Sequence, residues 1–174
     1  MNPGDRVRDF YEIINRAFSI NLDFSKARRP LEVAFIFRKV QGELDRKGDD
    51  FVKMAANIMI TMGNLGQLRN GKRAEIINLM NSNYFLERTY HKLGFPNLST
   101  FFDQEKNHRN FKVHASMMEF IIGLILEIEG PELTMSILEK IIYSEIIYSS
   151  EPLQIDELLK AMREYTKSAK LPFK

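Results

Sequence analysis

Apolar side chains recur every three or four residues along almost the whole chain, a spacing that is typical of amphipathic helices. A first helix is predicted after Asp5, a candidate N-terminal cap. A second is predicted to start at Pro30, because proline fits the first helical turn, and to be interrupted at Gly48. The segment DDFVKMAANIMITMGNL is apolar on more than one side, which predicts a buried helix.

The second half of the chain carries signals for where helices start and end. Ser82 is a candidate N-cap for NYFLERTYHKL, and Gly94 is a candidate C-cap. The segment EFIIGLILEI could form a buried strand on composition alone, but its length and the helical pattern before it favour a helix. Gly130 is predicted to end this helix, and Pro131 to start the next one.

Composition agrees with an all-α fold in a single domain over residues 1–174. A length of 174 residues suits one domain, and 44% hydrophobic with 28% charged residues is typical of a folded globular protein. The absence of cysteine excludes disulfides, thiolate zinc sites and a cysteine nucleophile. No apolar run is long enough to span a membrane and no signal-peptide pattern opens the chain, so we expect an intracellular protein, whether cytoplasmic, nuclear or organellar.

Two pairs of polar residues are candidates for chemistry. Asp45 and Asp49 are four residues apart and Ser116 and Glu119 are three apart, so each pair shares a helix face beside apolar sequence. Carboxylates held against a core need neutralisation, which a magnesium ion provides, and clustered carboxylates with such ions hydrolyse phosphodiesters. The alternative is that these are solvated acids near helix starts, favoured there by the helix dipole.

Three blocks of the sequence resemble the ribonuclease III family. LDRKGDDFV (44–52) is similar to the family's LEFLGDAVL, and SNYFL (82–86) with KLGF (92–95) to SNETL…LGL. KVHASMMEFIIGLILEIEG (112–130) resembles KVLADVFEALIGAIYLDGG. The blocks occur in the family's order and together cover roughly residues 40–150. The resemblance implies a ribonuclease III-like helical domain.

That family cuts double-stranded RNA as a dimer, with a magnesium-binding acidic cluster in each subunit. Carried over by position, the cluster falls on Asp45, Asp49, Ser116 and Glu119, so the resemblance implies that Asp45, Asp49 and Glu119 hold Mg²⁺ or Mn²⁺. Ser116 could position a metal-bound water but carries no charge, and Asp45 is one methylene shorter than the family's glutamate. Because ligand charge tunes affinity for hard cations, we expect catalysis to be weakened or lost.

Other positions depart from the family as well. Arg46 and Lys47 stand where the family has apolar residues at its dimer interface, which leaves a homodimer, a heterodimer or an acidic partner surface open. Glu43 and Asp50 are conceivable substitute ligands, but neighbouring helical residues point about 100° apart, which argues against them. Because the residues after the last block are predicted to form one closing helix, we expect no double-stranded-RNA-binding domain.

Two locally basic segments are candidates for phosphate contacts: QLRNGKR and KNHRNFKVH. The candidate RNA-binding residues are Arg69, Lys72, Arg73, Lys106, Arg109 and Lys112. Since the net charge is only +2, solvated loops are the alternative. The three histidines, His91, His108 and His114, form no pair at helical spacing and are predicted to be ordinary surface or core residues. The methionines at 54, 59, 62, 117 and 118 are predicted to be core.

Three functions fit these observations. The first is a ribonuclease III-like domain that engages double-stranded RNA as a dimer in RNA processing or a ribonucleoprotein complex, with weakened or absent catalysis. The second is an active magnesium-dependent endoribonuclease. The third is an all-α protein-interaction domain unrelated to RNA.

Overall fold

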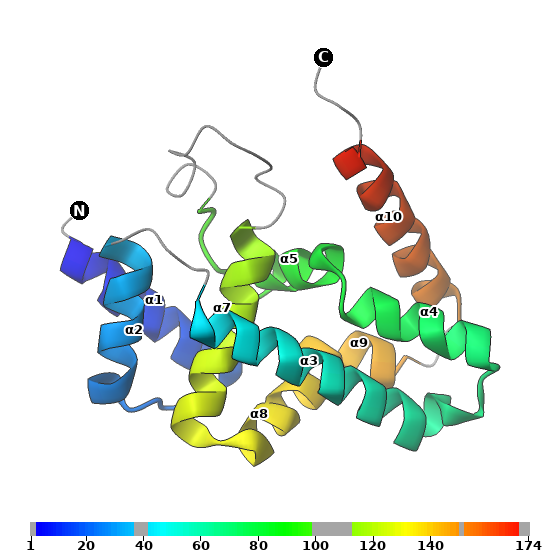
Figure 1. Ribbon diagram of the computed structural model, residues 1–174, viewed down its shortest axis with the longest axis horizontal. Coiled ribbons are helices and arrows are strands. Elements are labelled where there is room, and N and C mark those ends of the chain that lie inside the picture. Colours follow the sequence, from blue (N-terminus) through cyan, green and yellow to red (C-terminus); the bar gives the residue numbers. More distant parts are fainter. Residues whose placement is uncertain (1–2, 37–41, 99–112, 150–151, 171–174) are drawn as a thin grey trace.

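The computed structural model describes residues 3–36, 42–98, 113–149 and 152–170 (Figure 1). Every regular element within these ranges is helical, which confirms the all-α prediction. None of the described helices combines the length and the apolar character needed to cross a membrane.

The chain begins with two helices, α1 (Pro3–Phe18) and α2 (Phe24–Ile36), which pack against each other. The prediction that α2 starts at Pro30 was wrong, because Pro30 lies inside the helix. Asp23 sets the true start: its Oδ1 accepts hydrogen bonds from the Ser25 backbone N–H at 2.9 Å and from the Ser25 hydroxyl at 2.6 Å. The helix starts at this cap although Pro30, which lies inside it, has no backbone N–H to donate.

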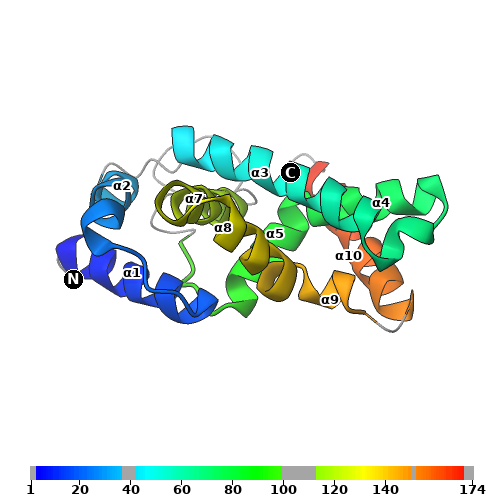
Figure 2. The same cartoon turned by 90° about the horizontal axis from the view of Figure 1, so that it is seen from below.

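The centre of the molecule is the crossing of α3 (Glu43–Met62) and α7 (Val113–Glu129), visible in Figures 1 and 2. The prediction that Gly48 interrupts a helix was wrong, because Gly48 lies buried inside α3. A Cβ atom added at Gly48 would lie 1.8 Å from the carbonyl oxygen of Glu119, and one at Gly123 would lie 1.9 Å from that of Leu44. The two backbones therefore touch, and only glycine fits at either contact.

The remaining helices surround this crossing. They are η1 (Asn64–Gln67), α4 (Asn70–Met80), α5 (Asn83–Lys92), α8 (Pro131–Ile137), the π-helical turn η2 (Leu138–Ile142), α9 (Ser144–Ile147) and α10 (Pro152–Lys170). The predicted cap of α5 is confirmed, because Ser82 Oγ accepts the Phe85 N–H at 3.2 Å. Gly94 and Gly130 follow α5 and α7 with φ of +81° and +87°, conformations that favour glycine.

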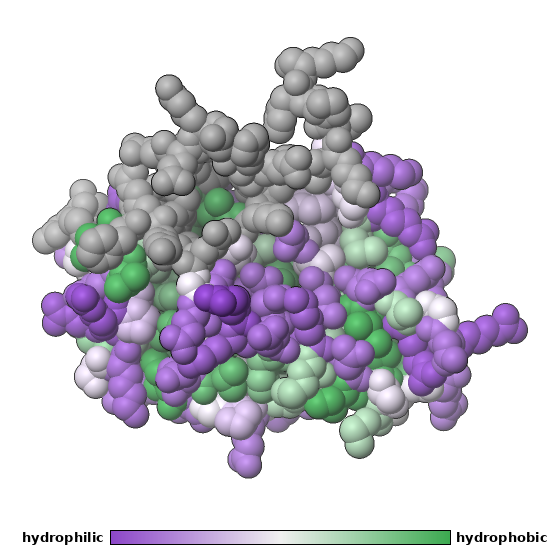
Figure 3. Space-filling model, in the orientation of Figure 1, coloured by the Kyte–Doolittle hydropathy of each residue, from purple (hydrophilic) through white to green (hydrophobic). Residues whose placement is uncertain are grey.

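The core forms around α7, and α3 covers it with only one face. Met117 and Met118 are fully buried, as predicted. Met54 and Met62 are 46% and 83% exposed, so the prediction that they are core was wrong, and Ile58 between them is 40% exposed. These three residues lie four apart and form an apolar stripe on the outer face of α3. Hydrophilic and hydrophobic residues are intermingled on the face seen in Figure 3.

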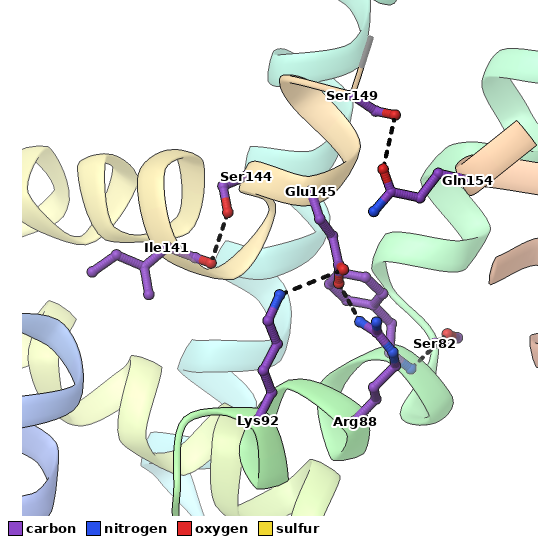
Figure 4. A network of polar contacts seen from close by, with 9 residues as sticks. Ser82, Arg88, Lys92, Ile141, Ser144, Glu145, Ser149 and Gln154 are labelled. Carbon is purple, nitrogen blue, oxygen red and sulfur yellow. Dashed lines mark hydrogen bonds and ion pairs between the residues drawn. The ribbon is translucent and has the colours of Figure 1, made fainter. Parts of the chain in front are cut away.

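Helix α9 is joined to α5 by a partly buried ion-pair network (Figure 4). The carboxylate of Glu145, only 11% exposed, accepts a hydrogen bond from Arg88, and Lys92 Nζ lies 3.5 Å from its other oxygen. Next to it, the Ser144 hydroxyl donates to the Ile141 carbonyl at 3.3 Å. The network fixes the short α9, which has few residues of its own to bury.

Replacing Glu145 with glutamine should lower the free energy of unfolding by about 1–2 kcal/mol, because two cations on α5 lose their charged partner in a mostly buried place. Urea unfolding followed by circular dichroism measures the loss. The matched control is Glu157→Gln on the exposed face of α10, which should change stability by less than about 0.5 kcal/mol. Equal effects of the two variants would show that the network contributes nothing specific.

Candidate functional site

Asp49 and Glu119 lie at the α3–α7 crossing. Gly48, the residue before Asp49, touches the backbone of Glu119, so the two acids extend from the same contact between helices. Both residues are partly buried. The resemblance implies both residues for metal binding, and the helices that carry them make contact although the two positions are about 70 residues apart in the sequence.

Asp49 forms an ion pair with a lysine on its own helix. Lys53, one turn after Asp49, donates from Nζ to Asp49 Oδ2 at 2.5 Å. The pKa of the Lys53 ammonium is raised, first by this hydrogen bond and then by the charges of Asp49, Asp50 and Glu119. Asp49 therefore already has a positive charge beside it.

Asp45 has a different role in the structure. Its Oδ1 accepts the backbone N–H of Gly42 at 2.8 Å, which closes the first turn of α3. A carboxylate at this position satisfies a backbone donor that the helix leaves free and is favoured by the helix dipole. Of the two alternatives for these acids, a metal ligand or an acid that stabilises the start of a helix, the second describes Asp45.

The residues that the resemblance implies for metal binding do not form a ligand set that fits a magnesium ion. Asp45 caps a helix, Asp49 is paired with Lys53, and Ser116, one turn before Glu119 on α7, contributes a hydroxyl without charge. Among the described residues, the only three metal-ligating side chains whose ligand atoms lie within 4.8 Å of one another are elsewhere. Mg²⁺ demands near-octahedral oxygen ligands at about 2.0–2.1 Å, which this arrangement does not offer.

The predicted basic residues lie away from the acids where they can be placed. Lys72 pairs with Asp156 of α10, and Arg73 donates to the Gly66 carbonyl at 3.1 Å, so both stabilise the chain itself. Arg69 is exposed at the start of α4. These residues follow the end of α3, which by helix rise is about 20 Å along the axis from Asp49. Lys106, Arg109 and Lys112 fall outside the described residues.

The two cations in the first block of the resemblance are differently placed. Lys47 bridges Glu43 at 3.0 Å and Glu127 of α7 at 2.8 Å, so its charge is balanced within the chain. Arg46 is exposed, and its Nε lies 3.4 Å from the Gly42 carbonyl oxygen. Only Arg46 of the two is therefore presented outward on α3.

A second polar cluster joins three helices, and sequence reasoning missed it. Glu87 Oε1 lies 3.4 Å from His114 Nδ1 and 4.0 Å from His91 Nε2, while Tyr165 of α10 donates to Glu87 Oε2 at 2.8 Å. His114 is buried and its Nε2 accepts the Leu98 N–H at 3.0 Å. Glu87 and His91 are four residues apart, which was visible in the sequence, but His114 joins them only through the fold.

The protons in this cluster favour a hydrogen-bond network over a metal site. A neutral imidazole has one lone pair, and that of His114 is used by Leu98, so Nδ1 carries the proton and donates toward Glu87. A metal-ligating histidine normally donates from its second nitrogen, whereas here that nitrogen accepts.

The pKa directions within the cluster agree with that network. Burial would raise the pKa of Glu87, but hydrogen bonds from His114 and Tyr165 bring it below its usual value. Burial lowers the pKa of His91. The carboxylate is thus held ionised between its donors.

No protein-family model, no curated protein and no solved structure matches the chain.

Proposed function

We propose that the chain is a ribonuclease III-like helical domain that engages double-stranded RNA as a dimer, in RNA processing or a ribonucleoprotein complex, with weakened or lost catalysis. The observation that supports this most is the α3–α7 crossing. The first and third blocks of the resemblance meet there through Gly48 and Gly123. A Cβ atom added at Gly48, the neighbour of Asp49, would lie 1.8 Å from the carbonyl oxygen of Glu119.

The weakened catalysis rests on the side chains around that pair. The position that would supply a second aspartate is Ser116, and Asp45 is engaged at the start of α3. Lys53 adds a positive charge where a dication would have to bind. Fewer negative ligand groups and one more cation both lower affinity for a hard divalent ion.

The dimer has a candidate surface on α3. Met54, Ile58 and Met62 are exposed along its outer face, and Arg46 is exposed near its start. Apolar side chains gathered on one helix face are typical of surfaces that bind another protein. Whether the partner is a second copy or a related chain is decided by the mass of the purified protein in solution.

The test is binding and cleavage of a long RNA duplex. We expect salt-dependent binding: with about three phosphates contacted, affinity should fall about 40-fold between 50 and 200 mM salt. We expect no cleavage products with Mg²⁺ or Mn²⁺. Arg69→Ala should weaken binding, whereas Lys160→Ala on the exposed face of α10 is the matched control.

Two results would replace this proposal. Metal-dependent products that disappear in Glu119→Ala would mean an active endoribonuclease in which three acids suffice. Absence of duplex binding even at low salt would favour the all-α protein-interaction domain, for which the apolar stripe on α3 is the supporting observation.

A further inference from the structure

We propose that α10 is a releasable strap, which opens away from α4 and α5 while the α3–α7 crossing stays folded. The hydrogen bond from Tyr165 to Glu87 is the latch that keeps this strap closed. This property of α10 goes beyond the proposed function and does not depend on RNA binding.

Helix α10 is long but shallowly packed. Ten residues of α7 are buried, whereas the core side chains among the described residues of α10 are Ile155, Leu158 and Leu159. From position 160 on, every described side chain of α10 is partly buried or exposed. Figure 1 shows the C-terminal turns of α10 extending beyond α4 and α5. Since packing supplies most of the stability of a helix in a protein, we expect α10 to open more readily than α7.

Two ion pairs join α10 to α4, but both are too open to solvent to be the latch. Asp156 pairs with Lys72, and Arg163 Nη2 lies 3.5 Å from Glu75 Oε1. The four side chains are between 36% and 60% exposed. Ion pairs at such places typically change an equilibrium by about fivefold at most. They therefore orient α10 on α4 but hold it weakly.

The latch lies further along α10, where Tyr165 meets α5. Its hydroxyl donates to Glu87 Oε2 at 2.8 Å, and its ring centroid is 5.6 Å from that of Tyr84. Glu87 is only 21% exposed, and its other carboxylate oxygen lies 3.4 Å from His114 Nδ1. A hydrogen bond to a partly buried carboxylate is stronger than an exposed ion pair. This bond thus holds the part of α10 that apolar packing holds least.

A second tyrosine offers a matched comparison. Tyr148, at the end of α9, donates from its hydroxyl to Glu139 Oε1 at 2.7 Å, which is the same kind of bond. Tyr148 is 58% exposed and lies outside α10. Tyr165→Phe and Tyr148→Phe therefore each take one hydroxyl away from a glutamate, but only Tyr165→Phe takes it from the latch.

Hydrogen–deuterium exchange of the full chain, followed by mass spectrometry of its peptides, measures how readily each helix opens. After correction for intrinsic rates, peptides from α10 should exchange at least about tenfold faster than peptides that span positions 117–125 of α7. Tyr165→Phe should speed the exchange of α10 by a further factor of about ten or more, because the closed strap loses a hydrogen bond to a charged acceptor. Exchange of α7 should not change. Tyr148→Phe should leave α10 as it is in the wild type.

Three results would overturn the proposal. One is a wild-type α10 that exchanges as slowly as α7, since the two helices would then open together. Another is a Tyr165→Phe variant in which α10 exchanges as in the wild type, or in which α10 and α7 speed up equally. The third is an equal acceleration of α10 in Tyr148→Phe. Because no RNA is present in these measurements, they fail or succeed separately from the duplex-binding test.

Discussion

Gly48→Ala and Gly123→Ala should each lower the free energy of unfolding by at least about 3 kcal/mol. The more destabilised of the two variants is expected to leave little folded protein. The added methyl at position 48 would lie 1.8 Å from the Glu119 carbonyl oxygen, and that at position 123 would lie 1.9 Å from the Leu44 carbonyl oxygen. The atoms in the way belong to backbone, so no side-chain rotation can relieve the overlap. Urea unfolding followed by far-ultraviolet circular dichroism measures the effect.

The control is the same substitution where the chain has room. Gly71 lies in the first turn of α4, and a Cβ added there meets nothing within 4 Å. Gly71→Ala should be neutral or stabilising by about 0.5–1 kcal/mol, because alanine favours helix and restricts the unfolded chain. If Gly48→Ala were as stable as Gly71→Ala, α3 and α7 could not be in backbone contact.

His114→Ala should be the next most damaging change, with a loss of about 2–4 kcal/mol. The substitution leaves the Leu98 N–H without its acceptor and takes from Glu87 one of its donors, leaving Tyr165, and it opens a cavity of imidazole size in the core. His91→Ala is the control, because that side chain is 43% exposed and should cost less than about 1 kcal/mol. Thermal unfolding of the two variants side by side decides whether the buried histidine has the structural role assigned to it.

The carboxylate in the same network gives a pH signature. The folded-state pKa of Glu87 is below its unfolded value of 4.5, so its contribution to stability is fully present above pH 4.5. That contribution is lost as the pH falls through the folded-state pKa. The difference in unfolding free energy between wild type and Glu87→Gln should therefore be largest near neutral pH and shrink on acidification. A difference that stays constant into acid would contradict the network.

Local signals in the sequence were sufficient for some of the fold. Ser82 caps α5 through its own side chain, and Gly130 with Pro131 separates two helices through backbone preferences, so neighbours in sequence decide both. Pro30 misled because Asp23, seven residues earlier, provides a cap that outweighs one missing hydrogen bond.

The other predictions that failed concern contacts between distant segments. Whether Met62 is core depends on which helix covers that face of α3, and the apolar pattern of α3 does not say which face that is. The same holds for His114, whose partners Glu87 and Leu98 come from other parts of the chain. The four-residue spacing of Asp49 and Lys53 was readable in the sequence as an ion pair, and the structure forms it.

The glycine crossing also has a consequence for how this protein could change over time. Because backbone meets backbone at Gly48 and Gly123, the separation of the two helices does not depend on the neighbouring polar side chains. Residues 49, 53, 116 and 119 can therefore be exchanged without repacking the core, provided that the glycines stay. An ancestor or a descendant could gain or lose an ionic chemistry at this place by one or two substitutions, while the helical framework is inherited unchanged.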